Sequence, residues 1–165
     1  MPDPVPAFAD PAPAFADPAK APYAVSEEER AAIAAAIDTD ELVELALELG
    51  NIPSRSREEL AAAEFVHDWM AKEGFNPRKV GATPERPNVI GEYGGTGRGA
   101  NLLLTAHLDT ESPSGMREHD RFRYRESTLA DPEWTQCWLD EEGRLRGYPI
   151  SNDRGPMSCF LIAAK

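Results

Sequence analysis

The feature that most constrains the fold is a short apolar run that ends in a polar pair. Residues 101–109 read NLLLTAHLD, and they follow a glycine-rich stretch, GGTGRG. A continuous apolar run of this length beside a turn signal is typical of a strand buried on both faces. Because helical patterns precede it, the sequence predicts an α/β fold in which helices cover the faces of a layered sheet.

Helical periodicity marks three earlier segments, residues 26–37, 39–50 and 57–74. Ser26 and Ser56 each precede a glutamate by three residues, the spacing of a capping box at a helix start. Gly74 is expected to end the third helix, and Pro156 suits the first turn of a later one. A second strand, a hairpin turn and a last helix are predicted at residues 88–93, 139–147 and 157–165.

The first 25 residues differ in composition from the rest. The heptapeptide PAFADPA occurs twice in tandem, and proline and alanine dominate. Proline lacks a backbone donor and favours extended conformations, so residues 1–25 are predicted to form a flexible or polyproline-like arm. This arm is either an extension without function or a segment that docks its two phenylalanines on a partner subunit. Residues 26–165 are expected to form the folded part.

Charge and cysteine content exclude several classes of protein. The net charge of −12 argues against nucleic acid and anionic membrane surfaces as partners, because both attract clustered positive charge. No apolar run approaches the roughly 18 residues of a membrane span, and no signal peptide is recognisable. Two cysteines are too few for a disulfide framework, so a cytoplasmic location is expected. Cys159 is predicted to be a core residue, and Cys137 is not predicted to be a nucleophile.

The polar pair is His107 and Asp109, separated by Leu108. On an extended strand both polar side chains lie on one face, at the strand end where open α/β sheets place their sites. A carboxylate beside a histidine can accept one ring proton and orient the other nitrogen toward a metal. The same spacing also occurs as an ordinary structural pair at the end of a core strand.

Asp153 lies in the loop ISNDRGPM, just before the predicted last helix. A carboxylate can bridge two divalent ions that share an activated water. The alternative is a helix cap, a position that suits Asn152 or Asp153 equally well.

Four segments in order, "LGNIPSRSREELAAAEFVHDWMAKEGFNPRKV", "RPNVIGEYGG", "NLLLTAHLDT" and "NDRGPM", resemble the N-terminal part of a metallopeptidase family. The family contains acetylornithine deacetylase, succinyl-diaminopimelate desuccinylase, carboxypeptidase G, aminoacylase and carnosine dipeptidase. The resemblance covers roughly residues 40–165 and implies the N-terminal part of a zinc-peptidase-like catalytic domain. HLDT after an apolar strand is its most specific piece.

The resemblance implies a role for each residue. His107 matches a ligand of the first metal, Asp109 the carboxylate that orients this histidine, and Asp153 the carboxylate that bridges two metals. The metal is expected to be zinc, with manganese or cobalt as alternatives. The implied reaction is hydrolysis of an amide or other C–N bond of a small molecule by metal-activated water, and a homo-oligomer is expected.

Three departures qualify the resemblance. The family usually follows HxD with a small hydrophobic residue and proline, whereas this chain has Thr110-Glu111-Ser112-Pro113. The segment between His107 and Asp153 is longer than usual, and its His119, Arg121 and Trp138 either contact substrate or belong to a surface loop. An altered pocket would suit an aromatic amine such as nitroanthranilate. The family's general base and further ligands lie beyond the bridging carboxylate, so a second chain that carries the C-terminal remainder is expected. The alternatives are a non-catalytic truncated fragment and an interaction module.

Overall fold

A computed structural model describes residues 25–54, 56–95, 102–110 and 136–165. The chain divides into two units, Met1–Ala36 and Ile37–Lys165. Within the described residues the protein is a mixed α/β structure with four α-helices and two small two-stranded antiparallel sheets. The predicted arm, residues 1–25, falls almost entirely outside the described residues and stays a prediction.

Helix α1, Glu27–Ala36, belongs to the first unit. Its start is the predicted capping box: the amide of Glu29 donates to Oγ of Ser26 at 3.2 Å, and the amide of Ser26 donates to Oε2 of Glu29 at 2.7 Å. These reciprocal bonds satisfy amides that have no partner inside the helix. The helix buries none of its residues.

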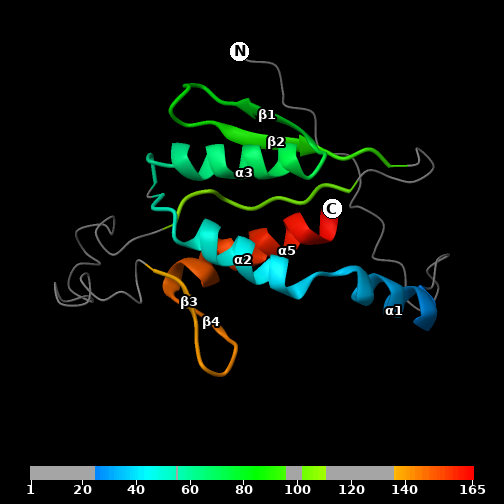
Figure 1. The fold of residues 1–165 in the computed structure, drawn as a ribbon. Helices are drawn as coiled ribbons and strands as arrows, with labels where there is room; N and C mark the ends of the chain where they lie inside the picture. Colours follow the sequence, from blue (N-terminus) through cyan, green and yellow to red (C-terminus); the bar gives the residue numbers. More distant parts are fainter. Residues whose placement is uncertain (1–24, 55, 96–101, 111–135) are drawn as a thin grey trace, which may run out of the picture. The chain divides into compact units, whose positions relative to one another are not determined.

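Helices α2, Thr39–Gly50, and α5, Gly155–Ala164, supply most of the core of the second unit. Figure 1 shows these two helices side by side. Asp38 caps α2 by accepting from two backbone amides, and Pro156 lies in the first turn of α5, as predicted. The buried core cluster consists of Leu45, Leu49, Val66, Met157 and Leu161.

Helix α3, Leu60–Lys72, begins three residues later than predicted. The capping box expected at Ser56 is wrong, because Glu59 is the N-cap residue without a side-chain cap and Ser56 bonds to Asp109 instead. Arg57 has a positive φ of 83°, which interrupts the helical path before Glu59. Gly74, at φ 86°, ends the helix as predicted.

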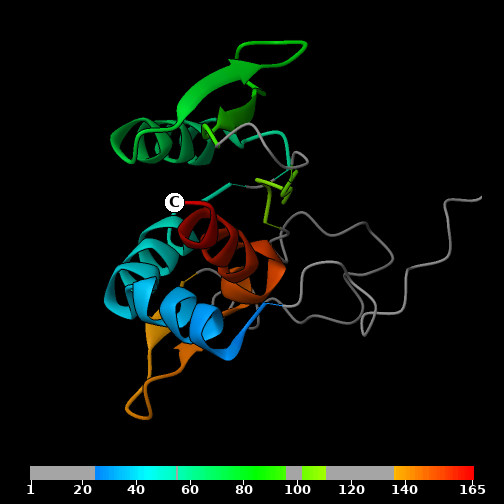
Figure 2. The ribbon, with the colours of Figure 1, turned by 90° about the vertical axis from the view of Figure 1, so that its right-hand side faces the viewer.

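Strands β1, Asn76–Val80, and β2, Asn88–Glu92, form an antiparallel hairpin that lies over α3 (Figure 2). Strand β2 confirms the prediction at residues 88–93. Strand β1 was not predicted, because its sequence NPRKV is polar and contains Pro77. Pairing with β2 places Asn76 opposite Glu92. Because this pairing depends on β2, the residues of β1 alone do not predict it.

The prediction of a strand at residues 101–109 is wrong for residues 102–109, which the structure describes. Residues 102–110 run extended but form no strand, and Leu102 and Leu103 are 83% and 85% exposed. A strand needs a neighbour for its amides and carbonyls, and the strands of the described parts pair only as β1–β2 and β3–β4. In Figure 1 this segment passes between α3 and the α2–α5 pair, where Ala106 and Leu108 pack against the core.

The predicted hairpin near Gly143 is present as β3, Trp138–Leu139, and β4, Leu145–Arg146. The backbone amide of Arg144 and the guanidinium of Arg146 donate to Asp140, which lowers the pKa of this carboxyl to about 2. In the part of the chain that the structure describes, no helix is long and apolar enough to cross a membrane.

The two cysteines have opposite environments. Cys137 is buried, whereas Cys159 is exposed, so the prediction that Cys159 is a core residue is wrong. Helix α5 is apolar on nearly all sides, and its periodicity therefore does not identify the face that is covered.

We predict that alkylation at pH 8 labels Cys159 and spares Cys137. Burial raises the pKa of the Cys137 thiol from 9.0 to about 11, and only the thiolate reacts. The same shift makes the folded state lose stability as the pH rises from 9 toward 11, because the unfolded thiol ionises first. Mass spectrometry of Cys159→Ser before and after denaturation isolates Cys137; prompt labelling of this variant in the native state would contradict the buried position.

Candidate metal centre

Ser54 and Ser56 hold the segment that carries His107 and Asp109. The amide of Thr110 donates to the carbonyl of Ser54 at 2.7 Å. The Ser54 hydroxyl donates to the carbonyl of Leu108 at 2.8 Å, and the Ser56 hydroxyl donates to Oδ2 of Asp109 at 2.7 Å. Ser54 and Thr110 are both buried. These bonds fix the backbone of residues 108–110 although no strand pairing supports it.

Arg154 ties a third segment to the same place. Its Nη2 donates to the carbonyl of Leu108 at 2.6 Å and also to the Ser54 hydroxyl. The side chain is fully buried, and burial lowers its pKa to about 10, against the raising effects of Asp109, Cys137 and Asp153. The guanidinium therefore remains charged at neutral pH. Its Nε and Nη1 are buried without an acceptor among the described residues.

The His107 ring is oriented by its neighbour in the predicted pair. Its Nδ1 lies 2.7 Å from the carbonyl oxygen of Asp109 and 3.3 Å from Oδ1 of the same residue. Both of these oxygens are acceptors, so Nδ1 carries a proton. In the neutral ring Nε2 then has a lone pair, which the Asn152 amide meets only when its NH2 group, in place of Oδ1, is turned toward the ring. This tautomer suits a metal ligand or a proton acceptor.

The residue at Nε2 of His107 is Asn152, with its Oδ1 at 3.1 Å. Asp153, the predicted ligand, is adjacent in the chain and half-buried, but no hydrogen bond or ion pair joins it to His107 among the described residues. The sequence indicates no role for Asn152 except that of a helix cap. Neither Asn152 nor Asp153 caps the helix, because Arg154 is the N-cap residue of α5 and the φ and ψ angles at positions 152 and 153 are non-helical.

The donor set falls short of a metal site. A structural zinc ion takes four protein ligands, and a catalytic one takes about three and a water. Over the ranges that the structure describes, no group of three or more His, Cys, Asp or Glu residues could hold a metal ion. Of the two side chains that meet here, His107 is of a type that zinc commonly binds, and the Asn152 amide is not.

The predicted substrate residues do not extend this set. His119 and Arg121 lie outside the described residues. Trp138 lies on β3 and is exposed.

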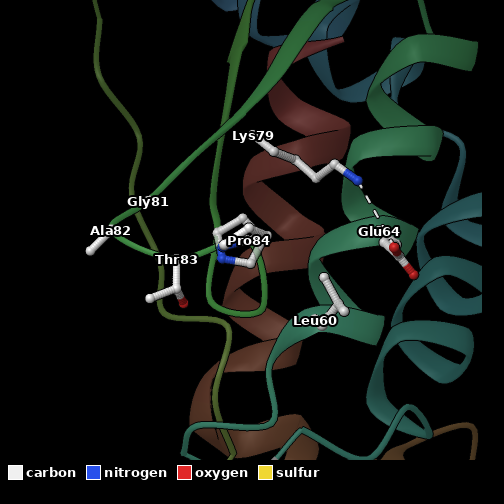
Figure 3. Close-up of a pocket in the computed structure, with 8 residues that line it drawn as sticks. Leu60, Glu64, Lys79, Gly81, Ala82, Thr83 and Pro84 are labelled. Atoms are coloured by element: carbon white, nitrogen blue, oxygen red, sulfur yellow. Dashed lines mark ion pairs between the residues drawn. The ribbon is translucent and has the colours of Figure 1, made fainter.

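A hollow of about 540 Å³ lies elsewhere, between α3 and the turn that joins β1 to β2. Figure 3 shows the Lys79 ammonium pointing at the Glu64 carboxylate, 4.0 Å away, beside Leu60 and Pro84. None of the candidate metal-site residues lines this hollow. No model of a known protein family matches the chain.

We predict that Arg154→Met speeds hydrogen exchange at the Thr110 amide, because the Leu108 carbonyl loses a charged donor. A hydrogen bond to a charged group contributes roughly 1.5–3 kcal/mol, so its loss corresponds to about a tenfold rise or more. NMR-detected exchange measures it, with the Phe75 amide, bonded to Met70 at 2.9 Å, as the reference. Arg144→Met, in the exposed hairpin, is the control. Unchanged Thr110 exchange in Arg154→Met would remove Arg154 from the support of this segment.

Proposed function

We propose that this chain contributes part of the active site of a metal-dependent hydrolase that cleaves an amide or other C–N bond. The observation that supports the proposal best is the His107 ring, held by Asp109 with its free nitrogen directed at residue Asn152. This is the orientation that a metal-binding histidine with a carboxylate partner requires. The order of four motifs that resemble the metallopeptidase family supports the same function.

In this proposal His107 binds a divalent metal, and Asp109 fixes its tautomer. Zinc is the expected ion, with manganese or cobalt as alternatives. Such an ion, when bound, lowers the pKa of a coordinated water so that it can attack a carbonyl carbon near neutral pH. The resemblance assigns the metal-bridging role to Asp153. This role stays a prediction, because no contact joins Asp153 to His107 among the described residues.

The proposal includes a second polypeptide that completes the site. The described residues provide too few donors for a metal, and Leu102 and Leu103, five and four positions before His107, are exposed and belong to no described strand. Added strands would cover these leucines and convert residues 102–106 into part of a layered sheet of zinc-peptidase type. A homo-oligomer of the completed unit follows from the resemblance, as does a small-molecule substrate.

The exposed leucines also support a second candidate, a non-catalytic fragment or interaction module that binds a partner through this segment. Native mass spectrometry with metal analysis separates the two. A bound divalent ion together with hydrolysis of N-acyl amino acids, dipeptides or amino-aromatics such as nitroanthranilate supports the hydrolase. A metal-free chain without any such activity, alone or with its partner, supports the module.

We predict that His107→Ala abolishes zinc binding. Loss of an outer partner costs roughly 10–100-fold in affinity, and loss of the ligand itself should cost more. Isothermal titration measures the effect. His67→Ala is the matched control, because His67 also lies next to an aspartate, Asp68 at 2.9 Å, but on the surface of α3. Equal zinc affinity in His107→Ala and the unaltered chain would end the proposal.

A further inference from the structure

Ser56 and Glu59 have the spacing of a capping box, but their side chains bond to different partners. The Ser56 hydroxyl donates to Oδ2 of Asp109 at 2.7 Å, while Glu59 accepts from the amide of Arg57 at 2.7 Å. The other oxygen of Asp109, Oδ1, faces Nδ1 of His107 at 3.3 Å. Among the described residues, Ser56 is the one side chain besides the His107 ring that bonds to this carboxylate. The two oxygens of Asp109 are thus divided between a serine and the histidine.

The conformation of Arg57, which follows Ser56, needs support from its surroundings. Its φ of 83° lies in the left-handed region that residues other than glycine rarely adopt. Glu59 provides this support through the Arg57 amide. Arg86 in turn holds Glu59, with its Nη2 3.0 Å from Oε1 and its Nε 3.2 Å from Oε2. We call the Glu59–Arg86 pair the clamp, because a two-point bond of this kind fixes the direction of a carboxylate as well as its place.

The clamp is charged at neutral pH. Glu59 is buried, and burial by itself would raise the pKa of its carboxyl. The hydrogen bonds from Arg86 and from the Arg57 amide outweigh burial, so this pKa lies below its ordinary value. The pKa of Arg86 is raised, chiefly by its hydrogen bond to Glu59 and to a smaller extent by the charge of Asp109. The clamp therefore lies within electrostatic reach of the candidate site.

We infer that Ser56 is a positioning residue, which fixes the Asp109 carboxylate toward His107, and that the clamp keeps Ser56 in place by stabilising the turn that follows it. The inference deepens the proposed function and rests on it. The other bonds that hold this segment end on main-chain atoms of residues 108 and 110, so they do not set the rotamer of the Asp109 side chain. Because Arg86 lies in the turn between β1 and β2, the clamp links this hairpin to the candidate site.

The rotamer of Asp109 tests the role of Ser56 in the metal-free protein. Scalar couplings between the backbone nitrogen and Cγ report whether the side chain occupies one χ1 rotamer or averages over several. The unaltered chain should show single-rotamer values, Ser56→Ala averaged ones, and Ser56→Thr, which keeps the hydroxyl at an exposed position, restored ones. Asp140, bonded to Arg144 and Arg146, is the internal reference. A single Asp109 rotamer in Ser56→Ala would overturn the role of Ser56.

A second substitution tests the clamp by the same couplings. Arg86→Met removes a guanidinium from an exposed position and should cause averaging at Asp109, to a smaller extent than Ser56→Ala. Lys79→Met is the matched control, because Lys79 on β1 pairs with Glu64 on α3 at 4.0 Å and so joins the same hairpin to the same helix. Unchanged couplings in Arg86→Met, or an equal change in Lys79→Met, would overturn the part assigned to the clamp.

Failure of this inference differs from failure of the proposed function. Equal zinc affinity in His107→Ala and the unaltered chain ends the metal role, while the couplings of Asp109 still report whether Ser56 fixes the carboxylate. A single Asp109 rotamer in Ser56→Ala overturns this inference alone, because zinc titration of the unaltered chain does not depend on that result.

Discussion

The arrangement of the candidate site depends on one buried cation. Arg154 reaches from the start of α5 to the Leu108 carbonyl and the Ser54 hydroxyl, and it brings together three segments that are far apart in the sequence. Taking a guanidinium out of water is costly, and acceptors with good geometry offset that cost. Because the side chain is fully buried, these acceptors cannot move away from it without leaving a charge unpaired. The guanidinium therefore constrains the backbone that flanks both His107 and Asn152.

This constraint explains how an irregular segment can orient a histidine. Residues 102–110 lack the ladder of hydrogen bonds that would hold a strand in place. Side chains replace that ladder: Ser54 and Ser56 bond to residues 108 and 109, and the amide of Thr110 returns a bond to Ser54. The His107 ring then needs only local contacts with Asp109. Rigidity at the polar end coexists with exposed leucines at residues 102 and 103.

Local signals predicted the elements that local interactions build. The capping box at Ser26 and the glycine at position 74 both act within a few residues, and the structure confirms both of them. Ser56 has the same spacing to a glutamate, but its hydroxyl donates to the carboxylate of Asp109, which is distant in the sequence. The sequence does not predict strand β1 and wrongly predicts a strand at residues 102–104, both for one reason. Strand formation depends on a neighbouring strand, and hydrophobicity does not identify that neighbour.

The difference between Asn152 and Asp153 has the same origin. Spacing in the sequence separates them by one position, too little to decide which side chain meets His107. The backbone determines which side chain meets His107, because its φ and ψ angles are non-helical at both residues, just before the N-cap residue Arg154 of α5. Arg154 must point into the core to reach Leu108, and this restricts the directions open to the two residues before it. The neutral Asn152 amide meets the histidine, and the negative charge of Asp153 favours the charged form of the buried guanidinium, whose pKa it raises.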